Sequence, residues 1–478
     1  MDWYLVSPEL SLCALAVLVI LLDLVIEKKD VLAVISVLGL IVPLGFTISL
    51  CGENDTTFNG MLAVDNFALF FKFLFIGITA MVIMSSREYV STKIEHLRGE
   101  FYALLLLSAL GLMLMAAARE MITIYVALEL SGMSLYALVS FLKDRKSAES
   151  GIKYILLGAI ASTTLLYGMV LIFGLTGTTH LEGIRDAIVT NGLREPALIL
   201  GLVLIASGFA FKISAVPFHM WAPDVYEGAP TPVTAYLSVA SKAAGFAVIL
   251  RIFFTAFDAP DWLHSDWSLL FGVLAAITMT VGNVIAIHQT NIKRLLAYSG
   301  VAQAGYLMVG LAAANAAGQS GIMFFLVAYA LANLGAFIVV IAISNKIGSD
   351  EISDFSGMIK RAPVLALVLA ICLISLTGIP PTAGFMGKLF VFKSAMDEGM
   401  LWLVIFGVVN SVIAAFYYFK VVKVIFLGAP KSNEMVPSSN ALRLTLVVST
   451  IGVLILGIYP YVLLNLTDIA DIATVMVP

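Results

Sequence analysis

Charged residues are scarce in this chain. Asp, Glu, Lys and Arg together make up 12% of its 478 residues, whereas hydrophobic residues make up 61%. A soluble domain carries about 25% charged residues, so the low charge argues against a soluble fold. Apolar runs long enough to cross a hydrocarbon core of about 30 Å recur from one end of the chain to the other. The sequence therefore predicts a polytopic membrane protein.

Cysteine is also scarce, and its spacing supports no metal or redox centre. The three cysteines, Cys13, Cys51 and Cys372, lie far apart, with no Cys-x-x-Cys pair and no neighbouring histidine pair. This pattern supports neither a disulfide framework nor a zinc site nor an iron–sulfur cluster. No glycine fingerprint follows a strand pattern, so no Rossmann or P-loop nucleotide site is predicted. We expect no metal, no bound cofactor and no nucleic-acid partner for this chain.

The apolar runs are continuous rather than alternating, which predicts an all-α bundle and argues against a β-barrel. The first run lacks a basic flank and a small-residue cleavage site, so we expect it to be retained as a span. We predict about fourteen spans, at residues 8–26, 31–51, 65–84, 99–117, 120–141, 152–175, 197–218, 230–254, 268–287, 296–312, 320–343, 363–396, 401–427 and 442–464.

The Lys and Arg residues are concentrated in every second loop between the predicted spans. Fourteen of them follow odd-numbered spans, and four (Arg119, Arg185, Arg194 and Arg251) follow even-numbered spans. Positive charge concentrates on the cytoplasmic side of membrane proteins, so we expect both termini to lie outside the cytoplasm. Because no targeting segment is visible, the expected location is a bacterial plasma membrane, although an organelle-encoded chain would have the same pattern.

Two predicted spans, the seventh and the twelfth, are interrupted. The seventh holds Pro217 before the polar stretch WAPDVYEGAPTP (221–232), and the twelfth holds LTGIPPTAGFMGK (376–388). Unwound backbone at membrane depth is tolerated only inside protein or beside a hydrated cavity, and paired breaks indicate an inverted repeat. The expected regions are an N-terminal three-span region (1–95), two inverted five-helix repeats (spans 4–8 in 96–254 and spans 9–13 in 255–428) and a C-terminal span (429–478).

Four charged residues lie too deep in the spans to reach water: Glu129, Lys212, Lys242 and Lys388. A charge at the bilayer centre costs about 2.5–3.5 kcal/mol even on the lenient insertion scale, so these residues should face the protein interior. Burial disfavours the charged form of an amine, which suits a group that takes up and releases protons. Lys72 lies near the start of the third span, and its role stays open.

A purely structural alternative is that Glu129 and Lys212 form a buried ion pair that fixes helix packing. This alternative leaves Lys242 and Lys388 unexplained, because the spans offer no obvious further acid to pair with them. Two histidines, His219 and His288, lie next to interrupted or terminal parts of spans. Imidazole titrates near neutrality, so either histidine can relay protons or serve only as a hydrogen-bonded interfacial residue.

Three stretches carry a resemblance to a known family: FKISAVPFHMWAPDVYEGAPTPVTAYLSVASKAAGFAVILR (211–251), NIKRLLAYSGVAQAGYLMVG (291–310) and LTGIPPTAGFMGKLFVF (376–392). They resemble the antiporter-like membrane subunits of proton-translocating NADH–quinone oxidoreductase, respiratory complex I, over roughly residues 95–430. In that family a span-5 glutamate pairs with a span-7 lysine, and lysines on spans 8 and 12 continue a hydrated line. The resemblance places these roles on Glu129, Lys212, Lys242 and Lys388. At Gln303 related sequences often have histidine, so no relay role carries over there.

The resemblance implies a subunit that moves protons out of the cytoplasm while partner subunits reduce quinone. It implies that flavin, iron–sulfur clusters and quinone belong to those partners, and that this chain has no redox active site. The expected partners are the lipid bilayer and other membrane-arm subunits, such as the antiporter-like subunit M and the small subunits K and J. Lys388 disfavours the M type itself, which usually has glutamate there. The chain end at Pro478 disfavours the L type, which has a long C-terminal extension.

Three other functions stay open. One is a subunit of a multisubunit cation/proton antiporter. The motif VYEGAPTPVTA (225–235) disfavours this class. Another is a subunit of a membrane-bound hydrogenase or of a ferredoxin-dependent complex, in which the electron donor differs. The third is a passive scaffold with a structural Glu–Lys pair.

Overall fold

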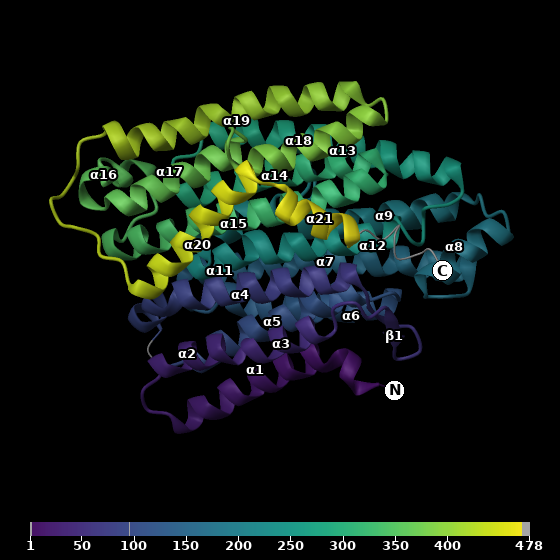
Figure 1. Cartoon of the computed structure of the whole chain (residues 1–478), viewed down its shortest axis with the longest axis horizontal. Helices are drawn as coiled ribbons and strands as arrows, with labels where there is room; N and C mark the ends of the chain where they lie inside the picture. Colours follow the sequence, from purple (N-terminus) through teal and green to yellow (C-terminus); the bar gives the residue numbers. More distant parts are fainter. Residues whose placement is uncertain (1, 95, 471–478) are drawn as a thin grey trace.

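The computed structural model describes residues 2–94 and 96–470, and this part of the chain is almost wholly helical (Figure 1). The predicted boundary at residue 95 and the end of the predicted region 429–478, residues 471–478, lie outside the described residues. The helices and the two short antiparallel strands are η1 (Trp3–Val6), α1 (Ser7–Val25), α2 (Asp30–Gly39), α3 (Ile41–Ser49), β1 (Asp55–Thr57), β2 (Leu62–Val64), α4 (Asn66–Lys93), α5 (Arg98–Ala117), α6 (Met121–Val139), α7 (Arg145–Thr176), α8 (Leu181–Thr190), α9 (Pro196–Ile213), α10 (Trp221–Gly228), α11 (Thr231–Tyr236), η2 (Leu237–Ser241), α12 (Lys242–Phe253), α13 (Asp261–Ile287), α14 (Ile292–Ala313), α15 (Ala316–Ile347), η3 (Ile352–Phe355), α16 (Met358–Arg361), α17 (Pro363–Thr377), α18 (Ala383–Asp397), α19 (Leu401–Leu427), α20 (Asn440–Ile458) and α21 (Tyr461–Ile469).

The predicted spans are confirmed. Within the described residues, thirteen helical segments are long and apolar enough to cross a membrane, and the second of them combines α2 with α3. The remaining predicted span, residues 363–396, consists of the two shorter helices α17 and α18. Its apolar part, α17, has 15 residues and cannot cross the hydrocarbon core alone. The interruption that the sequence indicated is therefore a real break in the helix.

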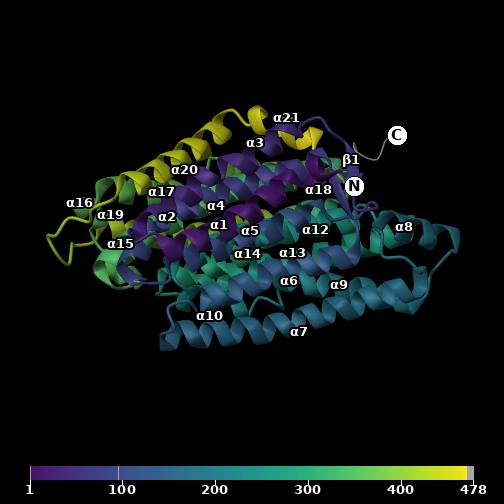
Figure 2. The ribbon, with the colours of Figure 1, turned by 90° about the horizontal axis from the view of Figure 1, so that it is seen from below.

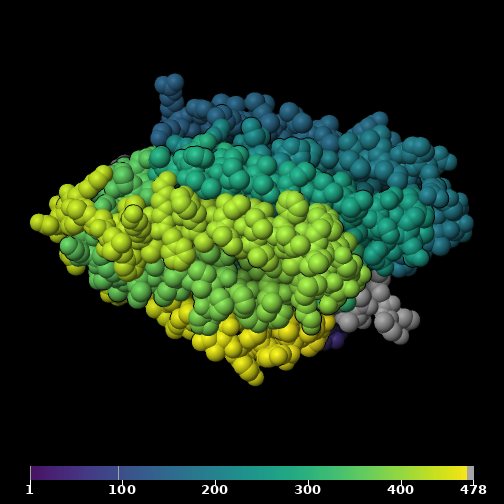
Figure 3. Space-filling model, turned by 90° about the horizontal axis from the view of Figure 1, so that it is seen from above, coloured from purple at the N-terminus to yellow at the C-terminus, as the bar shows by residue number. Residues whose placement is uncertain are grey.

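The chain crosses the bundle in order and then returns. In Figure 1 the colours run from α1–α3 at one edge, through α4 and α5, to α19 at the opposite edge, and α20 and α21 lie back over the middle. Contacts of α20 with α4, α15 and α18 tie this C-terminal segment to both halves of the chain. Figure 2 shows α7 running along one outer face, and Figure 3 shows α19, in yellow-green, running along another.

The centre of the bundle is the segment Thr231–Phe253, which comprises α11, η2 and α12. Every residue of this segment is buried. Its neighbours α14 and α15 are nearly as enclosed, whereas α7 and α19 expose large apolar side chains along one side. A charged side chain on α12 therefore faces other parts of the protein and not lipid.

Two ion pairs between helices are enclosed in the bundle. Lys72 of α4 bonds Glu9 of α1 at 2.8 Å, which assigns a partner to the lysine whose role the sequence left open. Arg251 of α12 bonds Asp65, the N-cap of α4, at 2.6 and 3.0 Å, and also donates to the Ala116 carbonyl at 2.9 Å. Counting Arg251 as a loop residue was wrong, because it lies in the last turn of α12 and is buried.

Replacing Arg251 by methionine should destabilise the protein strongly. The substitution leaves the Asp65 carboxylate buried without its partner, and breaking a buried ion pair from one side typically costs about 3–5 kcal/mol. We expect a clearly lower unfolding temperature of the detergent-solubilised protein for Arg251→Met. The control is Lys431→Met, which removes an exposed partner of Asp354 and should change stability by about 0–1 kcal/mol. Equal effects of the two substitutions would contradict a role for Arg251 in holding α12 to α4.

Candidate functional site

The first break places Lys212 at the carboxyl end of a helix. Helix α9 ends at Ile213, Ser214 adopts a left-handed conformation with φ of 62°, and the chain changes direction before α10 begins. Lys212 lies in the last turn of α9 and is buried. The carboxyl end of a helix carries partial negative charge, which favours a cation there. Within the described residues the Lys212 ammonium has no hydrogen bond or ion pair, and its stem lies beside Gly245 of α12.

The second break brings the ammonium of Lys388, which lies on the following helix, to the carboxyl end of α17. Helix α17 ends at Thr377, Gly378 adopts φ of 90°, and α18 begins at Ala383. The last carbonyls of a helix lack intrahelical partners, and the Lys388 ammonium donates to two of them, Thr377 O at 2.9 Å and Leu376 O at 3.3 Å. The nitrogen also lies 3.9 Å from the centre of the Tyr306 ring. Each broken helix thus ends beside a buried lysine.

Lys242 lies in the enclosed centre between the two breaks. It follows η2, a π-helical turn that the sequence did not indicate, and such turns are frequent at functional sites. Its ammonium donates to the carbonyl of Gly300 on α14, and the Tyr329 ring centre is 5.9 Å away. A Cβ atom on Gly300 would lie 2.7 Å from the Lys242 nitrogen, so a side chain at this position would displace the ammonium from its present place.

Contacts on α12 and α14 link the surroundings of the three lysines. Lys212 packs beside Gly245, which is three residues, about one helical turn, beyond Lys242 on α12. Lys242 and Lys388 both reach α14, at Gly300 and at the Tyr306 ring respectively. These two positions are six residues apart, so they are separated by about 9 Å along the axis of α14 at 1.5 Å per residue.

Glu129 lies on α6 and is half-buried. Its Oε1 atom is buried without a hydrogen-bond partner, and no ion pair joins Glu129 to Lys212 in the part of the chain that the structure describes. The carboxylate nevertheless acts electrostatically on the Lys212 ammonium. The role of this pair stays a prediction.

The two predicted histidines lie in different surroundings. His219 is buried in the linker between α9 and α10, and its Nδ1 atom has no hydrogen-bond partner among the described residues. His288 follows the last residue of α13 and is exposed. His219 therefore lies near the first break, whereas His288 lies at the end of a helix; a relay role for either stays a prediction.

A cluster of neutral polar side chains beside Lys388 was not predicted from the sequence. Asn283 of α13 donates to the Tyr306 hydroxyl at 3.1 Å and to Asn410 of α19 at 3.2 Å, and accepts a bond from Tyr417 at 3.0 Å. All of these side chains are buried. The cluster orients the Tyr306 ring that faces Lys388. Its only signal in the sequence is the presence of asparagine inside two apolar spans.

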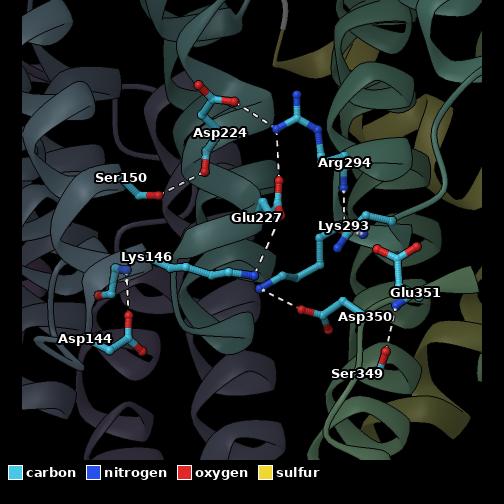
Figure 4. A network of polar contacts seen from close by, with 12 residues as sticks. Asp144, Lys146, Ser150, Asp224, Glu227, Lys293, Arg294, Ser349, Asp350 and Glu351 are labelled. Atoms are coloured by element: carbon cyan, nitrogen blue, oxygen red, sulfur yellow. Dashed lines mark hydrogen bonds and ion pairs between the residues drawn. The ribbon is translucent and has the colours of Figure 1, made fainter.

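A network of charged residues surrounds α10 (Figure 4). Asp224 and Glu227 belong to the polar stretch 221–232 and lie between two predicted spans, and the structure places them three residues apart on helix α10. Arg294 of α14 donates to both carboxylates, at 2.8 and 2.9 Å, and Lys153 of α7 bonds Asp224 at 2.8 Å. The network links the segment after the first break to helices from both predicted repeats.

The charge of Asp224 depends on these partners. Burial raises the pKa of the Asp224 carboxyl, but hydrogen bonds from Lys153 and Arg294 outweigh burial and hold the pKa below its ordinary value of 3.8. A carboxyl with a lowered pKa stabilises the folded state above its ordinary pKa, and this contribution disappears as the pH falls through the lowered value. The network should therefore be intact at neutral pH.

Replacing Asp224 by asparagine should lower the unfolding temperature at pH 7, and this difference should disappear once the pH falls below the lowered pKa of the native Asp224 carboxyl, where that carboxyl is also protonated. Thermal unfolding of the solubilised protein against pH measures this difference. Asp397→Asn, at an exposed position at the end of α18, is the control and should leave the profile unchanged. A difference of the same size above and below that pKa would show that the charge of Asp224 does not hold the network together.

Comparison with known proteins places this geometry in a family. The family model described as NADH:quinone oxidoreductase/Mrp antiporter, TM matches residues 118–414, which include both breaks. A curated relative from Dehalococcoides mccartyi, NADH-quinone oxidoreductase subunit N, is 46% identical over 97% of this chain and 98% of its own length.

Two solved structures have the same fold as this chain. A chain of respiratory complex I from Thermus thermophilus, solved with bound Aureothin, is 32% identical with a TM-score of 0.82 over 96% of this chain and 99% of that one. A chain of the membrane-bound sulfane sulfur reductase, an archaeal respiratory membrane complex, is 26% identical with a TM-score of 0.87 over 99% of both chains. The chain therefore belongs to the family of antiporter-like membrane subunits that includes subunit N of NADH-quinone oxidoreductase.

Proposed function

We propose that the chain is a proton-translocating membrane subunit of an NADH–quinone oxidoreductase, in which it moves protons out of the cytoplasm while partner subunits reduce quinone. One observation carries the proposal. Lys212, Lys242 and Lys388 are buried, and none of them forms an ion pair with a carboxylate in the described part of the chain. A structural lysine at such depth needs an acid, whereas a proton carrier needs an environment that tolerates both its charged and its neutral form.

Each predicted site residue has a role in this mechanism. The Glu129 carboxylate stabilises the charged form of Lys212, so moving the two apart releases a proton from Lys212. Lys242 receives that proton, since it lies one helical turn from the contact between Lys212 and Gly245. Lys388 receives the next proton at the second break. His219, near the first break, and His288 are candidate residues for relaying protons to or from these lysines.

The paired breaks support an inverted repeat, with spans 4–8 in residues 96–254 and spans 9–13 in residues 255–428. In both repeats a lysine sits at the carboxyl end of the broken helix. Alternating loop charge supports termini outside the cytoplasm of a bacterial plasma membrane. Flavin, iron–sulfur clusters and quinone then belong to partner subunits, and an M-type subunit and small K- and J-type subunits are the proposed membrane neighbours.

A second candidate is a membrane subunit of a different respiratory complex. The close structural likeness to a chain of the sulfane sulfur reductase favours it, at a TM-score of 0.87. In such a complex Lys212, Lys242 and Lys388 would transfer protons in the same way, but the electron donor would differ. Measuring the activity of the purified complex with NADH and with reduced ferredoxin as electron donors distinguishes the two candidates.

Replacing Lys212 by alanine is the first test. We expect the loss of proton pumping together with slower quinone reduction in inverted membrane vesicles, because a coupled relay restrains the redox reaction. Loss of a positioned proton-transfer group typically lowers the rate of the step about 100-fold or more. Unchanged pumping would mean that Lys212 only supports the fold.

Replacing Lys242 by methionine tests the centre of the line. The variant should assemble at normal levels on native gels, because methionine fills the volume of the lysine stem, but it should pump no protons. The matched control is Lys393→Met, which changes an exposed lysine five residues after Lys388 on α18 and should leave pumping intact. Normal pumping by Lys242→Met would favour the passive scaffold.

A further inference from the structure

We propose that the hydroxyl groups of Ser299 and Tyr418, held in place by Gln303, carry the proton between Lys242 and Lys388. This inference rests on the proposed function and names the route of its middle step. The sequence assigned no residue to this step.

Polar contacts lead from each lysine towards one hydroxyl pair, and in the described part of the chain neither hydroxyl bonds an ammonium directly. Gly300, whose carbonyl accepts the Lys242 ammonium, directly follows Ser299 on α14, and the Ser299 hydroxyl bonds the Tyr418 hydroxyl of α19. Gln303, one helical turn further along α14, approaches the Tyr418 oxygen with its Nε2 atom at 3.5 Å.

The series reaches Lys388 through a shared carbonyl. Gln303 Nε2 donates to Leu376 O at 2.8 Å, and Lys388 donates to the same oxygen at 3.3 Å. Leu376 lies in the last turn of α17, so its carbonyl is free for these contacts because the helix breaks at Gly378. The second break therefore presents its carbonyls to Gln303 as well as to Lys388.

The whole series is enclosed by protein. Ser299, Gln303 and Tyr418 are each at most 1% exposed. The Gln303 Oε1 atom is buried and has no hydrogen-bond partner among the described residues. A buried polar atom without a protein partner is a site for an ordered water. The proposed route needs such waters at two places, between Lys242 and Ser299 and between Tyr418 and Lys388.

The three side chains differ in what they can do with a proton. A hydroxyl accepts and donates at the same time, so it passes a proton on by gaining one on one side and releasing its own on the other. The Lys242 ammonium loses one proton, the Lys388 amine gains one, and Ser299 and Tyr418 end neutral. The amide of Gln303 does not titrate, so Gln303 is a positioning residue.

The structural alternative is that these contacts only pack α14 against α17 and α19. The two readings differ in their response to a group that can itself carry a proton. Imidazole titrates near neutrality, so Gln303→His would supply a relay beside the interrupted series, whereas it would not restore lost packing.

The experiment compares tyrosine-to-phenylalanine variants in the complete complex. Protons pumped per quinone reduced are measured in inverted vesicles. Tyr418→Phe should lower this ratio about tenfold or more, and the additional change Gln303→His should restore at least part of it. The matched control is Tyr102→Phe, which removes the hydroxyl of another buried tyrosine, on α5, and should leave the ratio unchanged.

Each outcome decides one point. Normal pumping by Tyr418→Phe together with loss of pumping by Lys242→Met would overturn the hydroxyl route and leave the proposed function standing. Normal pumping by both variants would overturn the proposed function itself. Loss of pumping by Tyr418→Phe without any recovery on adding Gln303→His would assign the contacts to packing. If Tyr418→Phe does not assemble, Ser299→Ala, which removes only one small hydroxyl, replaces it under the same criteria.

Discussion

An ammonium group enclosed in a lipid-embedded bundle needs oxygen atoms to accept its hydrogens, and a regular helix offers few that are not already bonded. Each backbone carbonyl inside an α-helix already accepts a bond from the amide four residues ahead. Free carbonyls arise where a helix ends, and this bundle ends two of its helices inside the membrane. Lys388 binds two carbonyls freed at the second break, and Lys212 lies in the last turn before the first. The second break thus supplies acceptors for Lys388, and the first break leaves Lys212 beside the carboxyl end of α9.

Lys242 meets the same constraint differently. It lies in a segment with no break, next to a π-helical turn, and reaches a carbonyl in the middle of α14. Gly300 makes this approach possible because it has no side chain between its carbonyl and the amine. The outer helices keep lipid away from this centre. Charged contacts secure the two ends of the central segment, with Arg251 and Asp65 at one end and the network of Arg294 at the other.

The acceptors around Lys242 and Lys388 are neutral. A carboxylate partner stabilises the charged form of an amine by several kcal/mol when both are buried, which would prevent release of its proton. Carbonyl and hydroxyl oxygens bind the ammonium more weakly, so the charged and neutral forms lie closer in free energy. The bundle uses close carboxylate partners where it needs stability, as for Lys72 and Arg251.

The amino-acid sequence by itself determined the spans, the two breaks and the depth of the four charged residues. These features follow from local chemistry, since apolar length sets a span and proline ends a helix. The tertiary structure alone decided the partners. Arg251 and Asp65 are 186 residues apart, and Ser299 and Tyr418 are 119 residues apart. Which side chains meet depends on how each helix is rotated against its neighbours, and the sequence of a single helix does not contain that information. For this reason the partner of Arg251 and the polar series between Lys242 and Lys388 were not visible before the helices were packed together.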